Sequence, residues 1–216
     1  MNPRNNASGG PIISVRAYPI EPATAIVAGQ VVKLTNGKVV AAAAAETGAI
    51  LGVANENHLA ADDALNPRAT GKEILIADGP DMVFECAAPL VEATGGSATT
   101  VATSGLAAFE AADMKGGKLQ LVGYGTDSAN TAGMKTVKEI TNFASGTFTV
   151  PSGGTNSKGD KFRVYPPVGF HGGNLSADGT GLVLTATAAL SLMVVGHDLE
   201  RGKILLKAKK HALGTE

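Results

Sequence analysis

The sequence predicts a mainly β protein, with a small barrel-like domain, a second β-rich module and few short helices. The strongest sign is the run from Val31 to Val40, in which two apolar-rich arms flank the pair Asn36-Gly37. Asn-Gly accepts positive φ at both central positions of a type I′ turn, whose twist matches that of the strands it joins. Composition agrees, because 28 glycines with 4% aromatic and 17% charged residues suit short strands and many turns.

The length and the cysteine count set limits on the fold. At 216 residues, the chain can bury a core as one domain or as two small ones. Cys86 is the only cysteine, which excludes an intrachain disulfide and a CxxC redox or metal site. The N-terminal segment lacks the apolar run of a signal peptide, and no segment approaches the roughly 20 apolar residues that cross a bilayer. We therefore expect a soluble protein made in the cytoplasm, with no membrane partner.

The N-terminal part is predicted to be an arm followed by a compact domain. Residues 1–22 form a flexible arm and strap, because the first eleven are polar and Gly-rich and Pro19 favours an edge strand over a helix. Residues 23–99 form the barrel-like domain. Beyond the hairpin, its strands are expected at residues 50–54, 72–77 and 82–86. The alanine tract 41–45 is expected to be extended or looped.

Residues 100–181 are predicted to form the second β-rich module. Residues 94–105, with Gly95-Gly96 and many Ser and Thr residues, indicate a connection leading into it. A short helix is expected at 106–114, with an extended conformation as the alternative. Strands are expected at residues 118–124, 136–140, 147–150 and 161–165.

The C-terminal strands are predicted to return to the first domain. Residues 193–196 followed by 202–207 faintly echo residues 51–54 followed by 72–77. Because chain termini often lie close together in a domain, residues 182–216 are expected to complete the barrel-like domain.

Charge is uneven along the chain, although the formal net charge is only −1. Residues 1–38 carry four basic and one acidic residue, residues 39–113 carry two basic and eleven acidic, and residues 114–216 carry twelve basic and seven acidic. The basic residues are scattered rather than clustered with aromatics, so we expect a protein partner rather than a nucleic acid.

No pattern for catalysis, metal binding or cofactor binding stands out in the sequence. The carboxylates of Asp62, Asp63, Asp78, Asp81 and Glu85 could gather round a hard cation, but their spacing matches no known ligand loop. The four histidines lack metal-ligand spacing and are expected at the surface. GxSxG, P-loop and dinucleotide fingerprints are absent, and Cys86 sits in an apolar strand. We expect a non-enzyme without a cofactor.

The first domain carries a resemblance to a known family. The run 25–88 contains Ala28-Gly29-Gln30-Val31-Val32-Lys33-Leu34, Gly37-Lys38-Val39-Val40, Ile50-Leu51-Gly52-Val53-Ala54 and Ile74-Leu75-Ile76-Ala77. This order of a G-x-V-V start, a turn, a Val-rich arm and a G-V-A strand resembles the capsid cement or head decoration proteins of tailed bacteriophages. The resemblance covers roughly the first 40 percent of the chain and implies a small β-barrel or β-tulip-like domain.

The resemblance implies a structural virion protein on the outer surface of an icosahedral head. Such a protein binds the major capsid protein, bridges neighbouring subunits and often associates with itself as a homotrimer. We expect residues 1–22 and the acidic middle of the chain to make most capsid and inter-subunit contacts. The candidate contact residues are Arg4, Asn5, Ile12, Arg16, Tyr18, Asp62 and Asp63.

The residue content bears on two alternative functions. A β-structured adhesin or carbohydrate-binding module is the main alternative, but sugar stacking needs exposed aromatics and the chain has no Trp and three Tyr. A small hydrolase on a β scaffold lacks a convergent set of catalytic groups.

Overall fold

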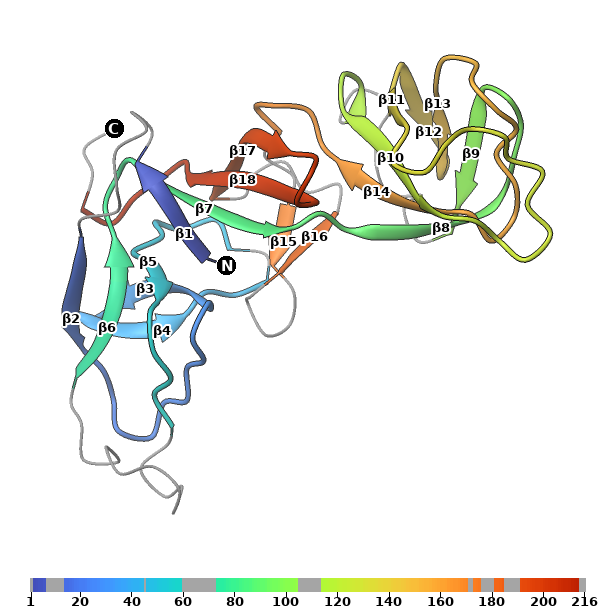
Figure 1. Ribbon diagram of the computed structural model, residues 1–216. Helices are drawn as coiled ribbons and strands as arrows, with labels where there is room; N and C mark the ends of the chain where they lie inside the picture. Colours follow the sequence, from blue (N-terminus) through green and yellow to red (C-terminus); the bar gives the residue numbers. More distant parts are fainter. Residues whose placement is uncertain are drawn as a thin grey trace.

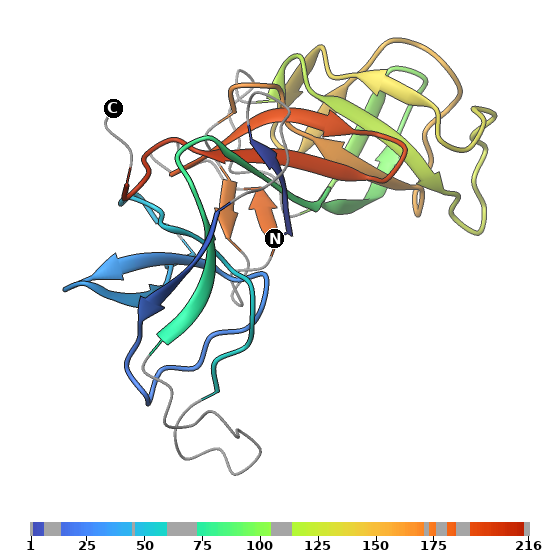
Figure 2. The same ribbon diagram turned by 60° about the vertical axis from the view of Figure 1, so that its left-hand side comes forward.

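The computed structural model describes residues 2–6, 14–44, 46–59, 73–104, 114–170, 173–175, 181–184 and 191–213. These residues form antiparallel sheets almost throughout, which confirms the predicted mainly β class. Figure 1 shows an elongated arrangement with an N-terminal lobe at one end, a central sheet and a distal lobe at the other end. The turned view in Figure 2 shows the same separation of the two lobes.

The N-terminal lobe is a five-stranded sheet in the order β2-β6-β5-β3-β4. Its strands are β2 (Val15–Pro19), β3 (Val31–Thr35), β4 (Lys38–Ala41), β5 (Gly52–Ala54) and β6 (Glu73–Asp78). The predicted hairpin is confirmed, since Asn36 and Gly37 have φ of 51° and 77° between β3 and β4. The sheet curls until Ile20 forms one bridge to Val39, yet it does not close into the expected barrel.

A compact apolar core fills the concave side of this curled sheet. It consists of the buried side chains of Ile20, Ile26, Val32, Val39, Leu51, Ala54, Ile74 and Ile76. Tyr18 and Leu34 pack against its margin. Because successive strand residues point to opposite faces, Ile74 and Ile76 lie inside while Leu75 stays 37% exposed.

The central sheet joins the two ends of the chain. Its order is β1-β7-β18-β17, with β1 (Asn2–Asn6), β7 (Met82–Ala87), β17 (Leu192–Asp198) and β18 (Lys203–Ala208). The C-terminal hairpin thus pairs with β7, directly after the N-terminal lobe. Residues 2–6 were expected in a flexible arm, but they form a strand on β7. Backbone pairing needs no apolar side chains, so a polar segment can join a sheet edge.

The distal lobe is a seven-stranded sheet in the order β11-β10-β14-β8-β9-β13-β12. Its strands are β8 (Leu90–Gly96), β9 (Thr100–Thr103), β10 (Lys118–Gly123), β11 (Val137–Glu139), β12 (Asn142–Ala144), β13 (Thr147–Thr149) and β14 (Lys161–Tyr165). The two edge strands, β11 and β12, are separated only by Ile140 and Thr141, so the sheet curls round its own core. Phe143 and Phe148 pack there with ring centroids 4.5 Å apart.

The expected connection at residues 94–105 is wrong. Most of it belongs to β8 and β9, which pair with each other and with β14 and β13. Gly96 serves close packing, because a Cβ there would lie 2.5 Å from the Thr100 carbonyl oxygen. The Gly-Gly pair therefore permits a bulged, tightly packed strand and does not end one. Since β8 begins at Leu90, residues 90–96 pair into the distal sheet and not the N-terminal one.

Smaller elements complete the structure. β15 (Gly173–Leu175) and β16 (Leu182–Leu184) form a two-stranded sheet. Of the helix expected at 106–114, all but Met114 lies outside the described residues. Among the residues that the structure describes, no helix has the length and apolarity needed to span a membrane.

Candidate functional site

The structure separates the predicted contact residues into three groups. Arg16 and Tyr18 lie together on β2, at an edge of the N-terminal lobe. Arg4 and Asn5 lie on β1, in the central sheet. The other three, Ile12, Asp62 and Asp63, fall outside the described residues. Of the predicted residues within the described ranges, β2 therefore brings one pair together, and that pair defines the candidate site.

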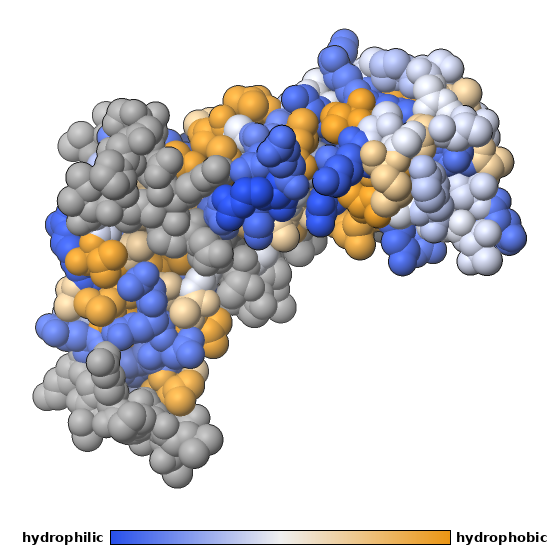
Figure 3. Space-filling view, viewed as in Figure 1, coloured by the Kyte–Doolittle hydropathy of each residue, from blue (hydrophilic) through white to orange (hydrophobic). Residues whose placement is uncertain are grey.

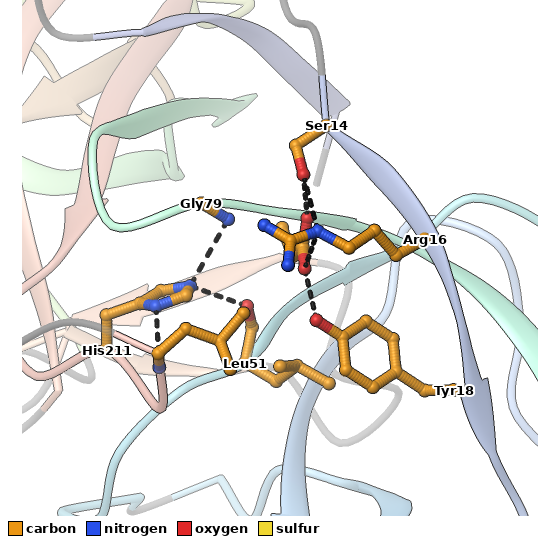
Figure 4. Close-up of polar contacts among 8 residues, drawn as sticks. Ser14, Arg16, Tyr18, Leu51, Gly79 and His211 are labelled. Carbon is orange, nitrogen blue, oxygen red and sulfur yellow. Dashed lines mark hydrogen bonds and ion pairs between the residues drawn. The ribbon is translucent and has the colours of Figure 1, made fainter.

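Arg16 and Tyr18 converge on a buried carboxylate, that of Asp78 at the end of β6 (Figure 4). The Asp78 side chain has no exposed surface. The hydroxyls of Ser14 and Tyr18 both donate hydrogen bonds to its carboxylate oxygens, and Arg16 Nε lies 3.3 Å from Oδ2. We call these four residues the Asp78 cluster. Burial and then the hydrogen bond to Asp78 raise the pKa of Tyr18 to about 12, so its hydroxyl stays protonated and remains a donor.

The Asp78 cluster fixes how β2 lies against β6. The Asp78 N–H donates to the Ser14 carbonyl at 3.1 Å, which makes Ser14 and Asp78 a hydrogen-bonded pair. Hydrogen-bonded and non-hydrogen-bonded pairs alternate along an antiparallel ladder. The backbone groups of Arg16 and Tyr18 therefore face β6, whereas those of Val15, Ala17 and Pro19 face away from it.

The outward edge of β2 is available for pairing. Among the described residues, no backbone hydrogen bond reaches Val15 or Ala17 from that side. Val15 is 44% exposed, and Leu75 on the same sheet face is 37% exposed. An unpaired strand edge beside apolar side chains is a template for an extended segment of another protein.

His211 ties the C-terminal segment to the same region (Figure 4). The Leu213 N–H donates to Nδ1 at 3.0 Å, so Nε2 carries the proton and donates to the Leu51 carbonyl at 2.7 Å. The Gly79 N–H lies 3.4 Å from Nε2, too far for a strong bond. Burial lowers the pKa of His211 more than the hydrogen bond to Leu51 raises it. The folded protein therefore holds this imidazole neutral.

We expect the stability to fall in mildly acidic solution. Burial also lowers the pKa of His197, whose Nε2 lies 2.6 Å from the Pro166 carbonyl oxygen. Because both folded-state pKa values lie below 6.5, the unfolded chain binds more protons, and stability present above pH 6.5 is lost as the pH falls through that range. Urea denaturation at intervals from about pH 7 to about pH 5 measures this loss.

The His211→Gln and His197→Gln variants test that assignment. Each should flatten the slope of the free energy of unfolding against pH across that range. The carboxylates with lowered pKa, Glu46, Asp81 and Asp160, titrate at lower pH than these histidines. An unchanged slope in the double variant would contradict the role of these histidines.

Of the carboxylates considered for a cation, Asp62 and Asp63 lie outside the described residues, and the other three do not converge. Asp78 bonds within its cluster, Asp81 pairs with Lys207 at 2.7 Å, and Glu85 accepts both Nη groups of Arg201 at 3.0 Å. Within the described ranges, no group of three or more His, Cys, Asp or Glu side chains is placed to hold a metal ion. These carboxylates instead join strands to one another.

Two further buried carboxylates stabilise loops. Glu46 pairs with Lys33 at 2.7 Å and accepts the N–H groups of Ala43 and Gly48. Asp160 accepts the N–H groups of Gly125 and Ser157 and the side-chain amide of Asn130. Against the effect of burial, Ser128 first and then these donors lower the pKa of Asp160. Both lie in the interior of loop regions and organise the backbone around them.

The expectation of surface histidines is wrong for His58. It is only 5% exposed, and its Nδ1 lies 2.7 Å from the Thr24 carbonyl oxygen. His197 and His211 are partly buried, and His171 lies outside the described residues. Each described histidine contacts a distant carbonyl, a relation that local polarity in the sequence does not reveal.

Sequence reasoning found Arg16 and Tyr18 but missed their partner. Asp78 was considered only as a turn residue or a cation ligand, and Ser14 was not singled out. The sequence did contain a signal for Asp78. An aspartate that directly follows the apolar strand 74–77 is a candidate for burial, and a buried carboxylate needs hydrogen-bonding partners. In comparisons with family models, curated proteins and solved structures, nothing matches this chain.

Proposed function

We propose that this chain is a structural virion protein that binds the exterior of a tailed-phage head. In this role it stabilises the head by bridging neighbouring major capsid subunits, and it associates with itself as a homotrimer. The observation that carries the proposal is the outward edge of β2, an unpaired strand edge that the Asp78 cluster holds in place. A prealigned edge pairs with a partner strand at a lower entropy cost than a free segment would.

The arrangement of the family-like segments supports the proposal. The four runs that resemble cement proteins lie in β3, β4, β5 and β6 and the residues next to them, which are neighbours in one sheet. They therefore form one structural unit, as a shared domain would. The elongated two-lobed shape in Figure 1 also suits a protein that contacts more than one capsid subunit.

The tyrosines do not favour the carbohydrate-binding alternative. Tyr165 is fully buried, and Tyr18 donates to Asp78. Tyr124 is 45% exposed, but its hydroxyl is engaged with the Ala132 carbonyl at 2.6 Å. Sugar-binding surfaces usually present several aromatic rings together.

Cosedimentation with mature, undecorated heads of the phage that encodes the chain tests the proposal. We expect saturable binding, with a copy number relative to the major capsid protein that matches three-fold and quasi-three-fold positions. Sedimentation equilibrium of the free protein tests the trimer. A wild-type protein that stays in the supernatant at all concentrations would reject the cement function.

Two substitutions at Ala17 test the role of the β2 edge. Ala17→Pro removes an N–H that points away from β6, so the ladder within the lobe is kept. We expect it to weaken head binding at least about tenfold, whereas Ala17→Ser should bind like the wild type. Equal binding of both variants, at equal thermal stability, would show that heads are bound elsewhere on the protein.

A further inference from the structure

A small pocket lies where the β17–β18 turn meets the outer face of the distal sheet. It has a volume of about 200 Å³. Its lining residues are Gln120, Val122, Met134, Lys135, Arg163, Leu199 and Glu200. They come from β10, β14, the turn before β11 and the turn after β17, so the pocket forms only when the central sheet and the distal lobe are in place. Around this junction, Figure 3 shows strongly hydrophilic and hydrophobic patches side by side.

Arg163 lies beside Tyr165 and Gly202 at this pocket. Burial raises the pKa of Tyr165 and the neighbouring Arg163 opposes that rise, while the Tyr165 hydroxyl donates to Gln120 Oε1 at 2.9 Å. Gln120 Nε2 in turn donates to the Leu199 carbonyl at 3.2 Å. On the other side, Gly202 packs so closely that a Cβ there would lie 2.5 Å from Arg163 Cζ and Nη1. The guanidinium therefore occupies the space that a side chain at position 202 would need.

Among the described residues, no carboxylate forms an ion pair with Arg163. A guanidinium offers five N–H donors, so Arg163 has donors to offer a ligand. Lys135, also on the pocket wall, makes no ion pair among the described residues. Glu200 lines the pocket as well, but it forms no ion pair with either cation in that part of the structure.

A partly buried cation without a counter-ion is costly, and it favours an anion in the adjacent space. We propose that this pocket binds a carboxylate carried on a short aliphatic stem, with Arg163 as its main ligand and Lys135 as a second cation. A guanidinium matches a carboxylate in geometry because its N–H groups donate two parallel hydrogen bonds. Val122, Met134 and Leu199 supply the apolar wall that the stem contacts.

The volume of the pocket limits the size of the ligand. Pockets for cofactors and drug-sized ligands usually exceed about 300 Å³, so this one suits a single acidic side chain or a small dicarboxylate. Those two sources present the same chemistry. The inference does not depend on head binding, because it rests on the pocket and its charges alone.

Titrations followed by amide NMR test the proposal. The probes are glutarate, the blocked tripeptide acetyl-Ala-Glu-Ala-amide, and their neutral counterparts glutaramide and acetyl-Ala-Gln-Ala-amide, all at constant ionic strength. We expect saturable shifts at Val122 and Leu199 with glutarate, with the Glu tripeptide, or with both, and none with the neutral probes. Binding of the tripeptide indicates a protein side chain as the source, and binding of glutarate alone indicates a free dicarboxylate.

Substitutions of the charged residues distinguish a carboxylate site from a general effect of ionic strength. Arg163→Gln should weaken binding at least about tenfold, and Lys135→Gln by about threefold. Glu200→Gln should tighten it by about twofold to fivefold, because it removes a repulsive charge. Lys161→Gln, on the same strand but outside the pocket lining, is the matched control and should lose less binding than Lys135→Gln.

Three results would overturn the proposal. They are absence of saturation by both acidic probes in the wild type, equal binding of the neutral probes, and equal loss of binding in the Lys161 and Lys135 variants. If Arg163→Gln does not fold, the proposal is still tested by Lys135→Gln, which should weaken binding, and Glu200→Gln, which should tighten it. Both residues are exposed, and neither hydrogen-bonds to Tyr165.

Discussion

Gly52→Ala should lower the free energy of unfolding of the N-terminal lobe by about 3 kcal/mol, among the largest effects of any single methyl group here. A Cβ at Gly52 would lie 2.1 Å from the Ala77 carbonyl oxygen and 3.0 Å from its carbonyl carbon. Both are backbone atoms of β6, the strand paired with β5, so the methyl group cannot be accommodated by a rotamer change. The two strands would have to separate at the centre of the sheet.

Gly95→Ala is the matched control, because it adds the same group in another strand. A Cβ at Gly95 meets nothing within 4 Å, so we expect a change within about 0.5 kcal/mol. Urea denaturation of both variants gives the comparison, and hydrogen exchange of the Val53 and Ala77 amides locates the effect. A loss below about 1 kcal/mol at Gly52 would mean that β5 and β6 are less closely packed than the structure shows.

Local turn chemistry made part of the fold predictable. Asn36-Gly37 was expected to be a turn, and both residues have positive φ between paired strands, as do Ser145 and Gly146. Such signals need only adjacent residues, because the backbone conformation is set by the residue type itself. The strands at 73–78, 82–87, 161–165 and 203–208 were likewise found within one or two residues at each end.

Features that depend on distant partners were not predictable in the same way. Gly95-Gly96 suggests a turn locally, but Gly96 is required by the Thr100 and Asn156 backbones, which lie next to it in the fold. Closure of either lobe also depends on how far a sheet curls, and the sequence carries no direct measure of that. The strands of the N-terminal lobe were expected close to where they lie, but the expected barrel was wrong, because the curled sheet does not close.

The candidate site also contains both kinds of feature, those set by adjacent residues and those that depend on distant partners. Arg16 and Tyr18 lie on β2. Pro19 in this strand favours an edge position, so the edge was predictable from the sequence. Ser14 and Asp78 are 64 residues apart, and His211 and Leu51 are 160 apart. A single sequence cannot pair residues over such separations, because polar groups are matched only once the sheet has formed. The cluster that holds the edge therefore became visible only in the structure.

Asp78→Ala is expected to lower the free energy of unfolding by about 3 kcal/mol, because it leaves the Ser14 and Tyr18 hydroxyls without their acceptor. Little of this comes from Arg16, whose side chain is 59% exposed and whose ion pair is screened by water. Tyr18→Phe alone should cost about 1 kcal/mol. In the double variant the two losses should not add, since both remove the same hydrogen bond.

Asp81→Ala is the matched control, at an exposed carboxylate three residues further along that pairs with Lys207. We expect it to leave the free energy of unfolding nearly unchanged, because exposed ion pairs contribute little. Additive losses in the Asp78 and Tyr18 double variant would instead mean that the two side chains stabilise the lobe independently.

The same variants connect stability with the proposed function. Without Asp78, β2 keeps its ladder to β6 but loses the buried side-chain anchor, so its outward edge becomes less ordered and pairs less well with a partner strand. We expect Asp78→Ala to reduce head binding at temperatures where the protein remains folded, and Asp81→Ala to have no such effect. Full head binding by Asp78→Ala under those conditions would show that the anchored edge of β2 is not the surface that meets the capsid.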